Sequence, residues 1–217
     1  MKFFLDTANL ADIKKYAALG VVDGVTTNPS LIAKEGVSLE KRIKEICAVV
    51  KGPVSSEVIA TDFDGMMKEG RKYSKWAKNV YVKTPMTPDG IRACRALTDE
   101  GVKVNVTLIF TANQGLIAAK AGAKLISPFI GRLDDISENG MTVVEDLVIM
   151  MANYNFDAEI LAASIRHPRH VTEAALAGAD IVTLPPAVLD LMFKHPLTDK
   201  GLATFLADWE KVKKLQK

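Results

Sequence analysis

The sequence predicts an α/β protein, a single (β/α)8 TIM barrel spanning residues 1–217 with an additional helix near the C-terminus. Two observations support this fold class. Eight short runs rich in β-branched residues alternate with amphipathic stretches along the chain, and 217 residues with 48% hydrophobic content can enclose one core. Strict alternation implies parallel strands joined by right-handed crossovers, and eight such units favour a closed barrel.

The expected strands lie at 3–6, 24–27, 54–59, 80–83, 104–110, 125–130, 159–165 and 181–184. An open, doubly wound sheet would show the same alternation. The motifs with which such sheets bind nucleotides, Gly-x-Gly-x-x-Gly after the first strand and Gly-x-x-x-x-Gly-Lys-Ser/Thr, do not occur here. The barrel is therefore the favoured architecture.

Helix signals fill the stretches between the strands. Ser38 is expected to cap a helix whose apolar face runs from Leu39 to Val50. Thr87 and Pro88 open another helix, which ends at Gly101. These caps support the boundaries of the alternating units.

After the eighth strand two more helices are expected, at 187–194 and about 199–215, although one is enough to finish a barrel. The surplus final helix carries an apolar stripe that must be covered. Either its own barrel or a neighbouring subunit could cover it, and the sequence leaves both open. The stripe consists of Leu202, Phe205, Leu206, Trp209 and Val212.

The charge balance excludes a broad surface for polyanions. Lys and Arg number 28 against 26 Asp and Glu, giving +2, so neither nucleic acid nor a membrane is an expected partner. The apolar opening stops at Asp6, short of a signal-peptide core, and no later apolar run could cross a bilayer, so a cytoplasmic location is expected. The isolated Cys47 and Cys94 are expected to be reduced packing residues.

Polar residues recur where strands end. Side chains alternate faces along a strand, so Val80 and Val82 facing the helices would turn Lys83 into the barrel, and Leu108 would face outward. The same rule, with Leu161 and Ile165 taken as outward, predicts an inward polar set near the carboxyl ends, where barrels carry their active sites. This set is Asp6, Glu57, Lys83, Asn105, Thr107, Ser127 and Ser164.

This inward set suits carbonyl chemistry. A desolvated lysine is partly a neutral amine, which can attack a carbonyl, and Lys83 is the candidate. Asp6 and Glu57 can transfer protons, the latter through Thr107 and a water molecule. Two alternatives stay open: Asp6 caps the helix near Asn9, and Glu57 is only an ion-pair partner of Lys83.

An anion site is expected beside the sixth and seventh strands. Arg132, Ser164 and Arg166 follow these strands, and paired arginines near late strands of a barrel suit a phosphate group. The alternative for Arg132 is a salt bridge to Asp134 or Asp135.

A metal site is not expected, and no cofactor is implied. His167 and His170 open a helix without a nearby acidic partner, and His195 lies in a loop. We expect these histidines to be capping and surface residues.

Several ordered segments resemble the transaldolase family, specifically its short bacterial and archaeal branch, which also contains fructose-6-phosphate aldolase. The segments are Phe-Leu-Asp-Thr-Ala-Asn at 4–9, Gly-Val-Thr-Thr-Asn-Pro-Ser at 24–30, Val-Lys-Thr-Pro-Met-Thr at 82–87, Asn-Val-Thr-Leu-Ile-Phe at 105–110, Ser-Pro-Phe-Ile-Gly-Arg-Leu-Asp at 127–134 and Ala-Ala-Ser-Ile-Arg at 162–166.

The resemblance implies a role for each site residue, including Asn28, which strand alternation does not place. By this resemblance Lys83 is the Schiff-base lysine, Asp6 is the acid/base for the C4 hydroxyl, and Glu57 and Thr107 position a catalytic water. Asn28 and Asn105 hold hydroxyls of the dihydroxyacetone unit, Ser127 contacts its terminal hydroxyl, and Phe129 lies at the substrate. The phosphate is bound by Arg132, Ser164 and Arg166.

The implied reaction transfers a dihydroxyacetone unit from fructose 6-phosphate or sedoheptulose 7-phosphate to erythrose 4-phosphate or glyceraldehyde 3-phosphate, in the pentose phosphate pathway. The alternative is an aldolase that releases free dihydroxyacetone. The fructose-6-phosphate aldolases carry Gln and Tyr where this chain has Glu57 and Phe129, and they lack an arginine matching Arg166, which favours transaldolase.

Two further expectations concern assembly and a non-enzymatic alternative. Short-branch relatives form pentamers and decamers in which the final helix reaches a neighbour, so a homo-oligomer is expected. A protein of another class, a catalytically silent barrel that senses sugar phosphates, is argued against by the intact set of Asp6, Glu57 and Lys83.

Overall fold

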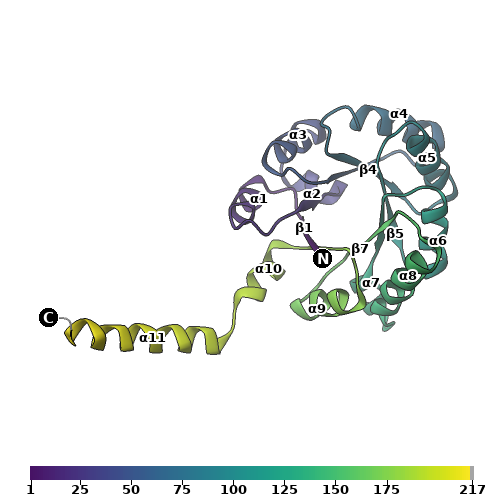
Figure 1. The fold of residues 1–217 in the computed structure, drawn as a ribbon. Helices are drawn as coiled ribbons and strands as arrows, with labels where there is room; N and C mark the ends of the chain where they lie inside the picture. Colours follow the sequence, from purple (N-terminus) through teal and green to yellow (C-terminus); the bar gives the residue numbers. More distant parts are fainter. Residues whose placement is uncertain (216–217) are drawn as a thin grey trace.

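The computed structural model describes residues 1–215, which form a closed barrel of eight parallel strands (Figure 1). Each strand pairs with the next, and β8 pairs with β1. The predicted barrel is therefore confirmed, and the open sheet is excluded. The strands are β1 (Lys2–Asp6), β2 (Gly24–Thr26), β3 (Val54–Glu57), β4 (Val80–Pro85), β5 (Val104–Ile109), β6 (Leu125–Pro128), β7 (Glu159–Ala162) and β8 (Ile181–Leu184).

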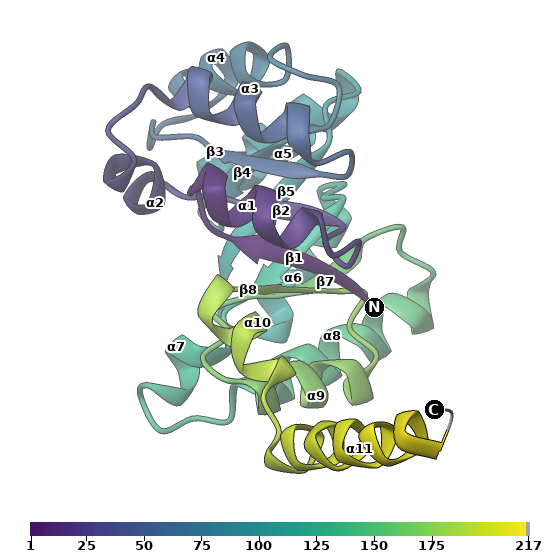
Figure 2. The same cartoon turned by 90° about the vertical axis from the view of Figure 1, so that its left-hand side faces the viewer.

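Helices surround the barrel on its outside (Figures 1 and 2). The two predicted caps are present: Ser38 Oγ accepts a hydrogen bond from Lys41 N–H, and Thr87 Oγ1 accepts one from Gly90 N–H. The helices are α1 (Leu10–Ala17), α2 (Pro29–Lys34), α3 (Leu39–Val49), α4 (Phe63–Tyr73), α5 (Pro88–Asp99), α6 (Ala112–Lys120), α7 (Ile130–Asp134), α8 (Gly140–Tyr154), α9 (Pro168–Ala177), α10 (Pro186–Phe193) and α11 (Pro196–Leu215).

The apolar core has two parts. Outward-facing strand residues such as Val82, Val104 and Val106 pack against the helices. A smaller cluster fills the barrel interior and forms a floor beneath the polar residues at the carboxyl ends. This floor includes Phe4, Tyr81, Leu125, Leu161 and Ile181.

Gly24 is required for this interior packing. It pairs with Phe4 across β1 and β2, and a Cβ atom at Gly24 would lie 2.5 Å from the Phe4 ring. Only glycine leaves room for the ring at this level. Phe4 therefore closes the interior two residues below Asp6.

The predicted orientation of Leu108 is wrong. Its backbone has a left-handed φ of 61°, and the pairing of β5 with β6 shifts register between Val106 and Ile109. Ile109 takes the buried place facing the helices, whereas Leu108 is half-buried. Thr107, before the irregularity, keeps its inward direction.

The predicted orientation of β7 is also wrong. Ile160 and Ala162 pack toward the helices, and Leu161 lies in the interior cluster. Ser164 follows the end of the strand with a left-handed φ of 61°, which interrupts the alternation. Ser164 still reaches the barrel mouth, because this left-handed residue, and not the strand alternation, sets the direction of its side chain.

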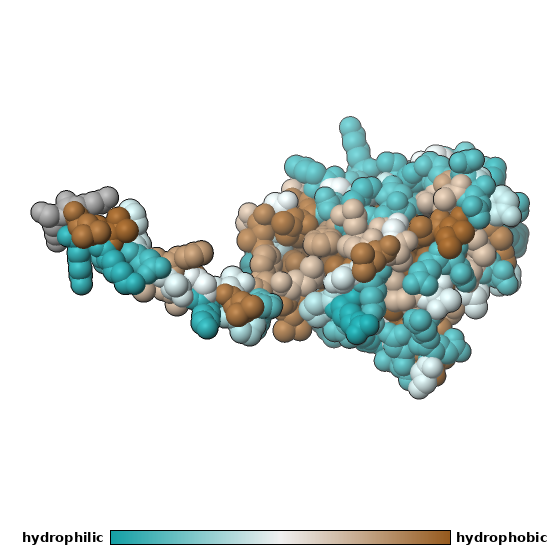
Figure 3. Space-filling model, turned by 60° about the horizontal axis from the view of Figure 1, so that its bottom comes forward, coloured by the Kyte–Doolittle hydropathy of each residue, from teal (hydrophilic) through white to brown (hydrophobic). Residues whose placement is uncertain are grey.

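Helix α11 extends away from the barrel and has no buried residue (Figures 1 and 3). Phe205 and Trp209 are exposed, like the rest of the predicted stripe, so the chain's own barrel does not cover it. None of the helices within residues 1–215 has the combined length and apolar character needed to span a membrane.

Both cysteines are free thiols. Burial raises the pKa of Cys94 to about 12 and that of Cys47 to about 11. These thiols are packing residues, in agreement with the sequence.

Candidate active site

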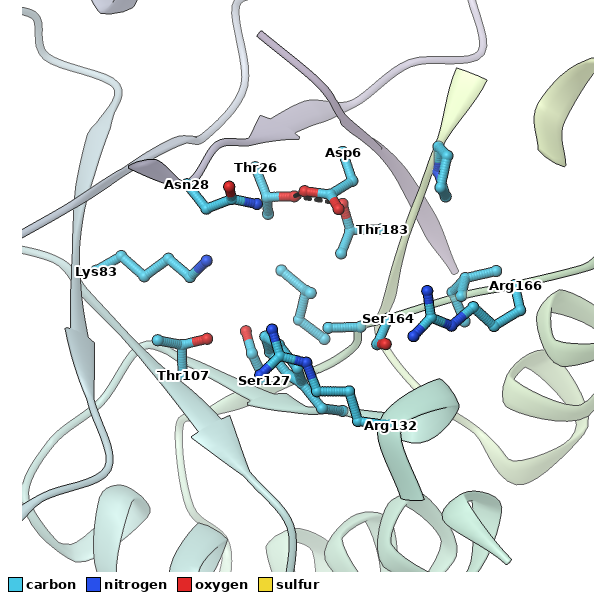
Figure 4. Close-up of a pocket in the computed structure, with 15 residues that line it drawn as sticks. Asp6, Thr26, Asn28, Lys83, Thr107, Ser127, Arg132, Ser164, Arg166 and Thr183 are labelled. Carbon is cyan, nitrogen blue, oxygen red and sulfur yellow. Dashed lines mark hydrogen bonds between the residues drawn. The ribbon is translucent and has the colours of Figure 1, made fainter. Parts of the chain in front are cut away.

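A hollow of about 200 Å³ opens at the carboxyl ends of the strands (Figure 4). All the predicted site residues except Glu57 and Asn105 line it. Lys83 projects from one side, and Arg132, Ser164 and Arg166 lie on the opposite side (Figure 4). The predicted residues on its wall are Asp6, Asn28, Lys83, Thr107, Ser127, Phe129, Arg132, Ser164 and Arg166.

Lys83 is only 5% exposed at the end of β4. Its Nζ lies 2.9 Å from Glu57 Oε2 and donates a hydrogen bond of 3.3 Å to the Thr27 carbonyl. The predicted ion pair with Glu57 is therefore present. The pairing does not exclude proton transfer, because a carboxylate beside the amine is also placed to accept its proton.

Glu57 lies behind this hollow. It is the register partner of Lys83 across β3 and β4, and it borders an adjoining apolar pocket together with Thr27 and Asn28. Its carboxylate therefore contacts the amine from the side of this adjoining pocket.

The carboxylate of Asp6 accepts a hydrogen bond of 2.8 Å from Thr26 Oγ1. Burial raises the pKa of Asp6, while Lys83 and the Thr26 hydrogen bond lower it and Glu57 raises it further. The helix-capping alternative is wrong, because Asn9 caps α1 by accepting a hydrogen bond from Asp12 N–H.

Thr107 presents a buried hydroxyl to the hollow. Within residues 1–215 its Oγ1 has no hydrogen-bond partner. A buried hydroxyl without a partner is costly, so this oxygen is suited to a water molecule or a substrate. The geometry fits the water-positioning role that the resemblance implies.

Asn105 is fully buried and does not reach the wall. Its Oδ1 accepts a hydrogen bond of 2.7 Å from Ser127 Oγ, and its Nδ2 donates to Ser55 Oγ at 3.1 Å. Asn105 therefore orients Ser127, which does line the hollow, whereas a direct contact with substrate would need these bonds to rearrange.

Asn28 is the N-cap of α2. Its Oδ1 accepts a hydrogen bond of 3.0 Å from Leu31 N–H. Because the cap uses the oxygen, the amide nitrogen can still serve a ligand in the hollow.

The two arginines at the rim differ in their contacts. The Arg132 guanidinium lies 5.0 Å from the Phe129 ring, and Arg166 forms an ion pair of 2.8 Å with Asp135. Asp134 pairs with His170 instead. The salt-bridge alternative for Arg132 is therefore wrong, and its exposed guanidinium lies over an aromatic ring beside the hollow.

His170 contradicts the expectation of a surface residue without an acidic partner. It is buried, its Nε2 lies 2.8 Å from Asp134 Oδ2, and its Nδ1 accepts a hydrogen bond from Arg166 N–H. Burial and the nearby His167 lower the pKa of His170, against the influence of Asp134 and Glu173. A neutral ring that donates from Nε2 satisfies both contacts.

The other two histidines are caps, as expected. His167 accepts a hydrogen bond from His170 N–H at the start of α9, and the exposed His195 accepts one from Leu197 N–H. No group of three or more His, Cys, Asp or Glu in the described part of the chain is arranged to hold a metal ion.

Gly131 lets α7 and the segment that follows β7 approach each other. Its N–H donates to the Ser164 carbonyl, and a Cβ atom there would lie 2.2 Å from that oxygen and 2.7 Å from the Arg166 side chain. A side chain at this position would push these two segments apart.

Comparison with known proteins agrees with this geometry. A family model described as Transaldolase/Fructose-6-phosphate aldolase matches residues 3–216. The chain belongs to this family.

Transaldolase-family relatives match along nearly their whole length. A protein of Anaeromyxobacter sp. (strain K), named "Probable transaldolase", is 58% identical over 217 residues, covering 100% of both chains. One of Hyphomonas neptunium with the same name is 62% identical over 211 residues, covering 97% of this chain and 98% of the relative. One of Methanococcus maripaludis (strain C5) is 59% identical over 210 residues, covering 97% and 98%.

Two further polar residues on the wall of this transaldolase-family site, Thr26 and Thr183, are missing from the sequence-based set. Val25 and Val182 face the helices, so strand alternation could have placed both threonines inside. The alternation of side chains along a strand, which identifies Lys83, is the signal that could have found both threonines.

Proposed function

We propose that this chain is a transaldolase that carries a dihydroxyacetone unit as a Schiff base on Lys83. The observation that carries the proposal is the buried Lys83 amine, 2.9 Å from Glu57, in a hollow that also contains Asp6. The substrates would be fructose 6-phosphate or sedoheptulose 7-phosphate as donor, and erythrose 4-phosphate or glyceraldehyde 3-phosphate as acceptor. The names of the relatives support this choice.

Imine formation would begin when Glu57 takes a proton from the Lys83 ammonium. The free amine adds to the C2 carbonyl of the ketose, giving a carbinolamine. Loss of its hydroxyl as water requires a proton, which Glu57 can return through a water molecule held at Thr107. The unpartnered Thr107 hydroxyl supports this position for the water.

Carbon-carbon cleavage would use Asp6 as the base. Asp6 takes the proton of the C4 hydroxyl, the C4 carbonyl forms, and the C3–C4 bond breaks. Its electron pair forms the C2–C3 double bond, while the imine π electrons move to nitrogen. The aldose phosphate leaves, and the enamine stays bound to Lys83.

Transfer would run the cleavage in reverse with a new aldehyde. Asp6, now protonated, gives its proton to the new C4 oxygen, and hydrolysis of the imine frees the product ketose. Phe129 on the wall supports transfer over release, because its ring has no proton to give the enamine.

The phosphate group would bind at the rim. Arg132 and Arg166 supply planar donors, and Ser164 supplies a hydroxyl on the same side of the hollow (Figure 4). Arg166 would exchange its exposed ion pair with Asp135 for the phosphate, at small cost.

The remaining parts of the proposal follow from this chemistry. An amine and two carboxylates supply every proton transfer, so we propose no metal and no other cofactor. A place in the pentose phosphate pathway and a cytoplasmic location follow from the proposed substrates. A homo-oligomer, pentamer or decamer, is supported by the uncovered apolar stripe of α11.

A transfer assay tests the proposal. We expect fructose 6-phosphate and erythrose 4-phosphate together to give sedoheptulose 7-phosphate and glyceraldehyde 3-phosphate, with little free dihydroxyacetone when the acceptor is omitted. Lys83→Arg is the matched control, since it keeps the charge but cannot form the imine. Rapid release of dihydroxyacetone without acceptor would favour the aldolase, and binding without turnover would favour a sensor.

A further inference from the structure

Three side chains from adjacent strands are hydrogen-bonded in series at the edge of the hollow. Thr26 Oγ1 on β2 lies 2.8 Å from Asp6 Oδ1 on β1 and 2.6 Å from Thr183 Oγ1 on β8. Both threonines are only 3% exposed, and all three side chains line the hollow (Figure 4). The series therefore belongs to the wall of the site.

Counting protons fixes the direction of this series. An ionised carboxylate has no proton, so Thr26 must donate its single hydroxyl proton to Asp6. Thr26 can then only accept in its contact with Thr183, which makes Thr183 the donor. With Asp6 ionised, the order is Thr183 to Thr26 to Asp6.

We infer that Thr26 and Thr183 are positioning residues for the proton transfer by Asp6, an inference that rests on the proposed function. Thr26 holds one carboxylate oxygen, so the other is left to take the proton of the substrate hydroxyl. A threonine hydroxyl can rotate, and the bond from Thr183 fixes it in the direction that Asp6 needs. Thr183 thus acts through Thr26.

The strand pairing makes this arrangement rigid. Asp6 is the register partner of Thr26, and β1 lies between β2 and β8, so the three backbones are tied by the barrel itself. Small displacements of a catalytic group can cost a large factor in rate. Losing either hydroxyl should therefore affect the cleavage step more than substrate binding.

Other charged groups act on Asp6 and remain unchanged when the threonines are replaced. Lys83 from β4 lowers the pKa of Asp6, and Glu57 from β3 raises it. Asp12, Lys15, Lys34, Glu35 and Asp190 border the neighbouring hollow to which Asp6 also contributes. Because Thr26 favours the ionised carboxylate, its loss should shift the acidic limb of kcat/KM to higher pH.

A double-mutant cycle tests the inference. We expect Thr26→Val to lower kcat roughly tenfold to a hundredfold and Thr183→Val roughly threefold to tenfold, with KM for fructose 6-phosphate changed less than about threefold. Combining them should give the effect of Thr26→Val alone, because Thr183 then has nothing to act through. Thr26→Ser and Thr183→Ser, which keep the hydroxyl, should restore most of the rate.

Thr84→Val is the matched control. Thr84 is buried beside Lys83 in β4, its hydroxyl has no partner within residues 1–215, and it does not line the hollow. Its kcat should stay near that of the original chain. If Thr26→Val does not fold, Thr26→Ala takes its place with the same expectation.

Trapping the Schiff base with borohydride separates the two proposals. The valine variants should form the adduct at Lys83 as readily as the original chain, since Asp6 is not needed for imine formation. No adduct in the original chain would overturn the proposed function. Three results, each with a normal adduct, would overturn only the positioning role. These are an unchanged kcat in the valine variants, serine variants as impaired as the valine variants, and a double variant in which the two single effects on kcat multiply.

Discussion

The Nζ atom of Lys83 lies 2.9 Å from Oε2 of Glu57, and the two side chains are 7% and 16% exposed. Desolvating two charges is costly, and a buried ion pair is weak evidence for a contribution to stability. The proposed catalytic use accounts for the arrangement, because in it the amine of Lys83 loses a proton to become a nucleophile.

Replacing Glu57 by Gln should lower kcat roughly a hundredfold to a thousandfold, since the amide cannot accept the lysine proton. Steady-state transfer assays measure this, and the borohydride adduct should still form, more slowly. Glu100→Gln, which breaks an exposed ion pair with Arg71, should leave kcat unchanged. Full activity of the Glu57 variant would contradict the role of this carboxylate.

The pH profile should report Asp6. In the proposed mechanism Asp6 must be ionised to take the C4 proton, and burial raises the pKa of this carboxyl. An exposed aspartate has a pKa of about 4. On acidification Asp6 therefore becomes protonated at a higher pH than an exposed aspartate does. We expect the acidic limb of kcat/KM above that value, and Asp6→Asn should abolish cleavage.

Asp64→Asn is the control for this profile, since Asp64 is exposed in the first turn of α4. It should leave the limb where it is. A limb at the pKa of an exposed aspartate would show that Asp6 is not the base.

The phosphate side should discriminate between acceptors. Arg132→Ala and Arg166→Ala are each expected to raise KM for erythrose 4-phosphate roughly tenfold to a hundredfold, the size of a lost charge-assisted contact. With saturating fructose 6-phosphate, kcat/KM for unphosphorylated glyceraldehyde should change little, because the donor's own phosphate contact does not enter this ratio. Arg169→Ala, an exposed residue paired with Glu173 in α9, is the control. Equal losses with both acceptors would count against a phosphate contact.

Phe129→Tyr should increase the release of free dihydroxyacetone. Phe129 lines the hollow, and a hydroxyl there could give the enamine a proton. We expect acceptor-independent release to rise at least about threefold, a modest part of what general acid catalysis supplies. Phe129→Leu, which adds no proton donor, should not show this increase in dihydroxyacetone release. An equal gain in both variants would point to looser packing instead.

Strand alternation predicted the site wherever the strands are regular. Asp6 and Lys83 follow the rule because β1 and β4 are uninterrupted. It failed at Leu108, which itself has a left-handed φ, and at Leu161, because the left-handed φ of Ser164 breaks the period between Leu161 and Ile165. Such backbone departures are set by tertiary packing, and a pattern of residue types does not record them.

Contacts between segments that follow different strands were beyond the sequence for another reason. The His170 pair with Asp134 joins residues 36 positions apart that follow different strands. The stripe of α11 was predicted, but whether the barrel covered it depended on the direction of the helix after α10. Neither relationship has a local signature.

The most direct test is reduction with borohydride in the presence of fructose 6-phosphate, followed by peptide mass mapping. The account predicts a reduced adduct of fructose 6-phosphate or of its dihydroxyacetone unit on the peptide that contains Lys83, and none in Lys83→Arg. An adduct on another lysine, or turnover without any adduct, would contradict it.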